Sequence, residues 1–133
     1  MPALVLPQEL DEPATEALVH SLHALPPTRR GQVLQGVAAL GVQPAQLLHT
    51  PRPSPGEARK LALALALAGP AQLLVLDEPT HHLDLPARLR LQRALSAWPG
   101  ALVLVTHDET LGRAVTRLCW QLDGRLMPGV APR

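Results

Sequence analysis

Two short runs of aliphatic residues, each followed closely by polar side chains, constrain the fold of this chain most strongly. The first run, 73–76, ends at Asp77 and Glu78, and the second, 101–105, comes just before His107. Continuous aliphatic runs of this length are typical of buried strands in a parallel sheet. Because ligands of such sheets bind at the carboxyl ends of the strands, the polar residues after both runs are candidates for a functional site.

Helical patterns precede and separate these two strands. Apolar residues recur there at helical spacing, and Pro, Gly and capping residues mark where the periodic segments begin and end. The pattern predicts helices at 14–25, 28–40, 55–68, 85–98 and 108–117, further strands at 4–6 and 118–122, and a Pro-containing connector at 41–53. The alternation of helix and strand in the second half predicts an α/β fold with a parallel sheet.

Composition narrows the class of protein. The chain has 133 residues, of which 47% are hydrophobic, so it can bury a core and is not a disordered tail. The core must be aliphatic because there is no Phe and no Tyr, and Cys119 stands alone, which excludes a disulfide framework or zinc cluster. The net charge of +1 gives no strong attraction to nucleic acid or anionic lipid. No apolar run reaches the roughly 18 residues of a membrane span, and no signal peptide is legible, so we expect a cytoplasmic protein.

The segment 54–57, Ser-Pro-Gly-Glu, has the pattern of a capping box at the start of a helix. One interpretation is purely structural, because such caps are common. The other interpretation gives weight to the glycine, which leaves backbone N–H groups bare at a helix N-terminus and so favours anion binding. In that case a phosphate contacts the Ser54 hydroxyl and the Gly56 amide.

Adjacent carboxylates at the end of a hydrophobic strand are the second candidate site. An acidic residue often simply terminates a strand, but two close carboxylates repel each other, and a divalent cation relieves that repulsion. Asp77 is then a candidate magnesium ligand, and Glu78 lies where an attacking water needs polarising. A lone histidine is usually structural, yet His107 falls at the same level of the predicted sheet as these two acids.

Five segments, in order and at matching spacing, resemble the motifs of the ATP-binding cassette (ABC) ATPases. Residues 5–9 are similar to the glutamine loop, 54–60 to the signature motif, and 73–78 to the Walker B strand with its catalytic glutamate. Residues 82–84 are similar to the D-loop, and His107 to the switch histidine. Such a set of motifs in order is far more specific than any one of them.

Within that superfamily the chain looks most like the ABC-F branch. Residues 79–85, Pro-Thr-His-His-Leu-Asp-Leu, differ at one position from the branch's usual Pro-Thr-Asn-His-Leu-Asp-Leu, and 120–126 also fit. ABC-F proteins carry two cassettes on one chain without a membrane domain, and many act on the ribosome. The resemblance therefore implies ATP and Mg²⁺ as cofactors, a second cassette as partner, and the ribosome as a further partner.

The resemblance also implies a fold with a missing part. A Walker A loop needs Gly, four residues and Gly-Lys-Ser/Thr, and no such spacing precedes the only lysine, Lys60. We expect an incomplete P-loop NTPase-like parallel sheet with a helical subdomain, a fragment that is inactive alone. Its regions are a strand with the glutamine loop (1–9), the helical subdomain up to the signature motif (10–54) and the ATPase core (55–133). Since the strand that leads into the Walker A loop lies between 101–105 and 118–122 in the family, we expect those two strands not to pair normally.

The resemblance assigns nucleotide and metal contacts to four residues. In the family mechanism, two cassettes sandwich two ATP molecules. Ser54 and Gly56 then contact the γ-phosphate held by the opposite cassette, while Asp77 and Gln8 serve Mg²⁺. Pro55 stands where the family has a glycine, which removes one backbone N–H from the phosphate contact.

The resemblance assigns catalysis and communication to three more residues. Glu78 polarises the attacking water, His107 stabilises the γ-phosphate in the transition state, and Asp84 links the two sites across the interface. Two other functions stay open. One is the ATP-binding subunit of a transporter, docked to a membrane domain, and the other is a degenerate cassette that only dimerises or binds a partner.

Overall fold

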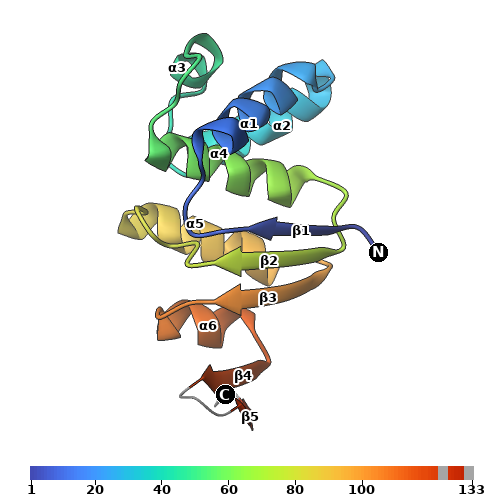
Figure 1. The fold of residues 1–133 in the computed structure, drawn as a ribbon, viewed down its shortest axis with the longest axis vertical. Coiled ribbons are helices and arrows are strands. Elements are labelled where there is room, and N and C mark those ends of the chain that lie inside the picture. The colour runs from blue at the N-terminus through green and yellow to red at the C-terminus, as the bar shows by residue number, and fades with distance from the viewer. Residues whose placement is uncertain (123–125, 131–133) are drawn as a thin grey trace.

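The computed structural model describes residues 1–122 and 126–130 (Figure 1). In chain order the elements are β1 (Ala3–Leu6), α1 (Glu12–Ala24), α2 (Pro27–Ala39), α3 (Pro44–His49), α4 (Pro55–Ala68), β2 (Leu73–Asp77), α5 (Leu85–Ser96), β3 (Ala101–Val105), α6 (Glu109–Val115), β4 (Leu118–Leu122) and β5 (Leu126–Val130). None of the described helices is long and apolar enough to span a membrane.

A three-stranded parallel sheet organises the fold, in the order β1-β2-β3. The strands are in register, so that Leu6, Leu76 and Leu104 lie side by side near their carboxyl ends. These ends therefore meet at one edge of the sheet (Figure 1). The predicted α/β architecture with a parallel sheet is confirmed.

Helix α4 lies between the sheet and the helices α1, α2 and α3 (Figure 1). One hydrophobic cluster joins α4, through Leu63, to the strands, α5 and α6. A second cluster joins α4, through Leu61, to α1, α2 and α3. Leu61 is fully buried and Leu63 is 1% exposed, so both faces of this helix are packed. Such packing, rather than helix propensity, supplies most helical stability in proteins.

The opposite face of the sheet is apolar but uncovered. Val5 is 62% exposed, Val103 44% and Val105 50%. These side chains alternate with leucines that are buried or partly buried, as the period of two along a strand requires. The expectation that 101–105 forms a fully buried strand is therefore wrong, because only one face of β3 is packed.

Strand β4 forms where the sequence predicts it, but it does not join the parallel sheet. It pairs antiparallel with β5, with Leu118 opposite Val130 and Cys119 opposite Gly129. In the described residues β3 and β4 thus belong to separate sheets, as expected. The two tryptophans are also separated, since Trp98 packs against the sheet cluster whereas Trp120 on β4 is 61% exposed.

The predicted helices form close to their predicted positions. The helix predicted at 55–68 is confirmed as α4, and the helices predicted at 14–25, 28–40, 85–98 and 108–117 form with ends shifted by at most two residues. The connector at 41–53 is not irregular throughout, because it contains α3. Proline at the first position starts this short helix, and its Leu47 is fully buried in the second cluster.

Candidate active site at the carboxyl edge of the sheet

Glu78 follows the last residue of β2 and has an unusual backbone conformation. Its N–H donates to the carbonyl of Val105 at 2.8 Å, which ties it to the end of β3. Its φ is +46°, in the left-handed region, and His82 in the same loop has a φ of +64°. Non-glycine residues rarely adopt this conformation, and such strain is concentrated at functional sites.

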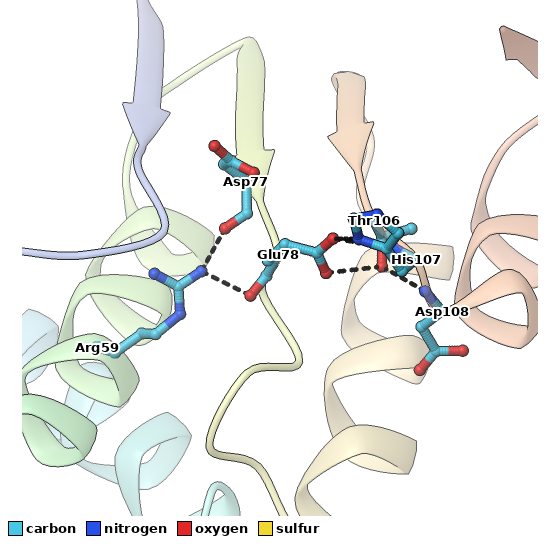
Figure 2. A network of polar contacts seen from close by, with 6 residues as sticks. All are labelled: Arg59, Asp77, Glu78, Thr106, His107 and Asp108. Atoms are coloured by element: carbon cyan, nitrogen blue, oxygen red, sulfur yellow. Dashed lines mark hydrogen bonds and ion pairs between the residues drawn. The ribbon is translucent and has the colours of Figure 1, made fainter. Parts of the chain in front are cut away.

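The Glu78 side chain crosses to the segment after β3. Its Oε1 accepts the N–H of His107 at 2.9 Å and contacts ring Nδ1 of the same residue, and its Oε2 lies 3.4 Å from the Thr106 hydroxyl (Figure 2). The Glu78 side chain is 17% exposed, whereas the His107 side chain is 98% exposed. A largely buried carboxylate is thus held beside an imidazole that faces solvent. This geometry suits a group that accepts a proton from, or orients, a water molecule.

Arg59 reaches the same region from the opposite side. Arg59 lies on α4 and is only 5% exposed. Its guanidinium donates hydrogen bonds to four main-chain carbonyls. Nη1 donates to Pro7 at 2.6 Å and Gln8 at 2.5 Å, and Nη2 donates to Asp77 at 2.5 Å and Glu78 at 2.8 Å (Figure 2). Burial lowers the pKa of the Arg59 guanidinium from its usual value, and the negative charges of Asp77 and Glu78 partly oppose that shift.

The start of α4 forms the predicted capping box. The Ser54 hydroxyl accepts the Glu57 N–H at 3.2 Å, and the Glu57 carboxylate accepts the Ser54 N–H at 2.8 Å. An added Cβ at Gly56 meets nothing within 4 Å, so the helix N-terminus is open on that side. The structural interpretation of this segment is confirmed, and its interpretation as a phosphate contact stays a prediction.

The remaining predicted site residues lie around the same edge. Gln8 is an exposed residue after β1 whose carbonyl is bound by Arg59. Asp77 is half-buried, with its carboxylate directed away from Arg59 in Figure 2. Asp84 accepts the Ala87 N–H at 2.9 Å and so caps α5. Among the described residues no three His, Cys, Asp or Glu side chains converge on a possible metal position.

Curated proteins of similar sequence include an ATP-binding protein and a member of the ABC transporter F family. The chain is 41% identical over 105 residues to the probable ATP-binding protein YheS of Escherichia coli K12. The matched region covers 77% of this chain and 16% of YheS. It is 40% identical over 98 residues to the energy-dependent translational throttle protein EttA of Mycobacterium tuberculosis, covering 73% of this chain and 17% of EttA. It is also 40% identical over 75 residues to ABC transporter F family member 2 of Arabidopsis thaliana, covering 56% and 11%. A scan against protein-family models finds no match.

Solved ABC structures share the fold. The ATP-binding subunit of an ABC transporter matches 96% of this chain and 58% of its own, with a TM-score of 0.73 at 19% identity. A dimeric ATP-binding cassette in a post-hydrolysis state, bound to ADP and Pi, matches 99% of this chain and 64% of its own, with a TM-score of 0.74 at 21% identity. The chain belongs to the ABC ATPase family. Its 133 residues span between 11% and 17% of the length of the three curated relatives above.

The ABC fold explains which predicted residues meet. Glu78 and His107 are 29 positions apart in the sequence and are brought into contact because β2 and β3 are parallel neighbours. No hydrogen bond in the described part of the chain joins the side chains of Ser54, Gln8 or Asp84 to that pair. The sequence motifs do not predict the contacts of Arg59, which is noted there only as one residue of the segment 54–60 that resembles the signature motif. Arg59 is followed by Lys60 and lies two positions after Glu57, so no local signal in the sequence distinguishes it as a buried residue.

Proposed function

We propose that this chain supplies the signature helix and the Walker B edge of an ABC-F-like cassette that binds and hydrolyses ATP together with a second cassette. The observation that carries the proposal is the contact between Glu78 and His107 at the carboxyl edge of the parallel sheet. Both residues match family motifs in the sequence. Their meeting at the edge where such sheets bind ligands supports a shared catalytic role.

Glu78 is proposed to polarise the attacking water. Its carboxylate is held by the His107 N–H, so its position is fixed before substrate arrives. The exposed His107 ring is proposed to contact the γ-phosphate as charge develops on it in the transition state. Such preorganisation lowers the barrier because the groups need not reorient during the reaction.

The residues that follow β1 and β2 fit the metal-binding part of a magnesium–nucleotide site. Magnesium is usually held by one or two carboxylates, with waters and substrate phosphates completing its coordination. Asp77, with its carboxylate turned away from Arg59, is proposed to supply the carboxylate, and the exposed Gln8 the amide oxygen. When bound, the metal neutralises charge on the phosphates.

The open N-terminus of α4 is proposed to face the nucleotide of a second cassette. Ser54 and Gly56 contribute the hydroxyl and the amide to that contact, and Asp84 lies at the interface as part of the D-loop. A dimeric cassette bound to ADP and Pi among the structural neighbours supports this arrangement. The 133 residues contain no Gly-x4-Gly-Lys-Ser/Thr loop, so the isolated polypeptide is proposed to be inactive.

For the whole protein, we favour a function in which ATP hydrolysis acts on the ribosome. EttA is named as a translational throttle protein, and another structural neighbour is an archaeal ribosome recycling factor in complex with a ribosomal stalk protein. A transporter role, with a membrane domain as partner, is the second candidate. It is favoured by the fold match to the ATP-binding subunit of an ABC transporter.

A chimera tests the catalytic proposal. The matched segment of this chain replaces its counterpart in Escherichia coli YheS, and ATP hydrolysis is measured with and without Glu78→Gln. We expect the substitution to lower turnover by about 100-fold or more while ATP still binds, because Gln cannot act as a general base. Glu109→Gln is the matched control, since Glu109 is exposed and, within the described part of the chain, pairs only with Arg113. Equal turnover in both variants would falsify the role of Glu78.

A further inference from the structure

Arg59 joins two strand ends that are far apart in sequence. Two of its carbonyl partners, Pro7 and Gln8, follow β1, and the other two, Asp77 and Glu78, end β2 and begin the next loop. The sequence separations are 52, 51, 18 and 19 residues. All four contacts come from one side chain on α4, so this helix is fastened to both segments at one point.

The contact with Asp77 and Glu78 depends on the strained backbone at Glu78. Successive carbonyls of an extended strand point in opposite directions, so two neighbours cannot both face one donor while the strand continues. The left-handed φ of Glu78 breaks the strand pattern, and both carbonyls then reach Nη2 of Arg59. Figure 2 shows the result: the Glu78 carbonyl faces Arg59, and its carboxylate faces His107.

We propose that Arg59 is a positioning residue that holds the Glu78 backbone in its left-handed conformation and couples α4 to both Glu78 and the Gln8 segment. Movement of α4 is thereby transmitted to the carboxylate that polarises water. This inference rests on the proposed function of Glu78. It goes further by naming the side chain that sets the position of Glu78 and the helix from which that position is controlled.

The chemistry of the site requires an arginine. A guanidinium presents a planar fork of donors, whereas a lysine ammonium is a compact group with three donors on a flexible stem. Lysine can therefore not reach all four carbonyls in this geometry. Arg59 is also buried, and its Nε has no hydrogen-bond partner among the described residues. Burying an unpaired donor costs free energy, which the four carbonyl contacts of the same side chain offset.

Amide exchange on the 133-residue chain tests the proposal directly. The His107 N–H donates to the Glu78 carboxylate, so its exchange rate reports where that carboxylate lies. We expect Arg59→Met to accelerate exchange of the His107 amide by about tenfold or more, and Arg59→Lys by a smaller factor, relative to the amide of the buried Leu91 on α5. Arg90→Met is the control, because among the residues that the structure describes Arg90 makes a single hydrogen bond, to the Ala39 carbonyl at 2.6 Å.

Two outcomes overturn the proposal. One is a His107 amide that exchanges at the wild-type rate in Arg59→Lys. The other is an equal acceleration of the His107 and Leu91 amides, because that is the signature of a residue that only stabilises the fold. Arg59→Lys keeps a buried cation, so it provides the test if Arg59→Met fails to fold.

Kinetics in the YheS chimera separate this proposal from the function on which it rests. We expect Arg59→Lys to lower kcat between about 10-fold and 100-fold with little change in the KM for ATP, because a slightly misplaced base affects the chemical step. A rise in KM at unchanged kcat overturns the positioning role. A wild-type chimera without ATPase activity overturns the proposed function instead, and the exchange experiment still decides whether Arg59 positions Glu78.

Discussion

Replacing Glu78 with glycine is expected to stabilise the chain relative to Glu78→Ala, even though both variants lose the same carboxylate. The reason is the φ of +46°, which costs a residue with a Cβ about 1–2 kcal/mol and costs glycine almost nothing. Glycine loses about 0.4–1 kcal/mol through the greater entropy of its unfolded chain. The midpoints of these two ranges differ by about 0.8 kcal/mol, and we expect Glu78→Gly to be more stable than Glu78→Ala by about that amount.

The assay is urea unfolding of the 133-residue chain. Both variants lose the contacts of the Glu78 carboxylate to His107 and Thr106, so the free energy of those contacts cancels when the two variants are compared. Glu109 provides the matched control because it lies in the first turn of α6, where the backbone is helical. There the order reverses, and Ala is more stable than Gly by up to about 1 kcal/mol. If Glu78→Gly is no more stable than Glu78→Ala, the strain assigned to Glu78 is absent and the reasoning fails.

Three further predictions follow from the site and the fold. In the YheS chimera, His107→Ala lowers kcat for ATP hydrolysis by more than it weakens ATP binding, since its contact is proposed to form in the transition state; equal losses in the two measurements contradict that role. The isolated 133-residue polypeptide binds magnesium-ATP more weakly than about micromolar by calorimetric titration, because it has no Walker A loop, and micromolar binding would show that another phosphate cradle exists. In hydrogen exchange, the amides of 118–122 are less protected than those of 73–77, which lie between two neighbouring strands; equal protection would mean that β4 is held as firmly as the parallel sheet.

The sequence predicts elements whose causes are local. The capping box at Ser54 and the aliphatic runs that become β2 and β3 are legible because neighbouring residues determine them. Helix α3 is missed because its proline-rich surroundings resemble a loop, while the burial of Leu47 that stabilises it comes from other helices. Burial of one face only of β3 is missed for the same reason, since the pattern does not say what covers a strand.

The candidate site divides in the same way. Glu78 and His107 can be placed at one sheet edge from the order of strands and polar residues alone. The positive φ of Glu78 and the four carbonyl contacts of Arg59 cannot be predicted, because they arise only when segments up to 52 residues apart are packed together. Long-range packing, rather than any local signal, therefore determines the direction in which the Glu78 carboxylate points.

The placement of the two tryptophans has a practical consequence. Without Tyr or Phe, the near-ultraviolet absorption and fluorescence of this chain come from Trp98 and Trp120. One packs against the cluster of the parallel sheet, and the other lies exposed on the antiparallel pair. A variant that keeps only Trp98 therefore emits from the parallel-sheet core, and a variant that keeps only Trp120 emits from the antiparallel pair. The two sheets can then be followed separately during unfolding, without attaching any dye.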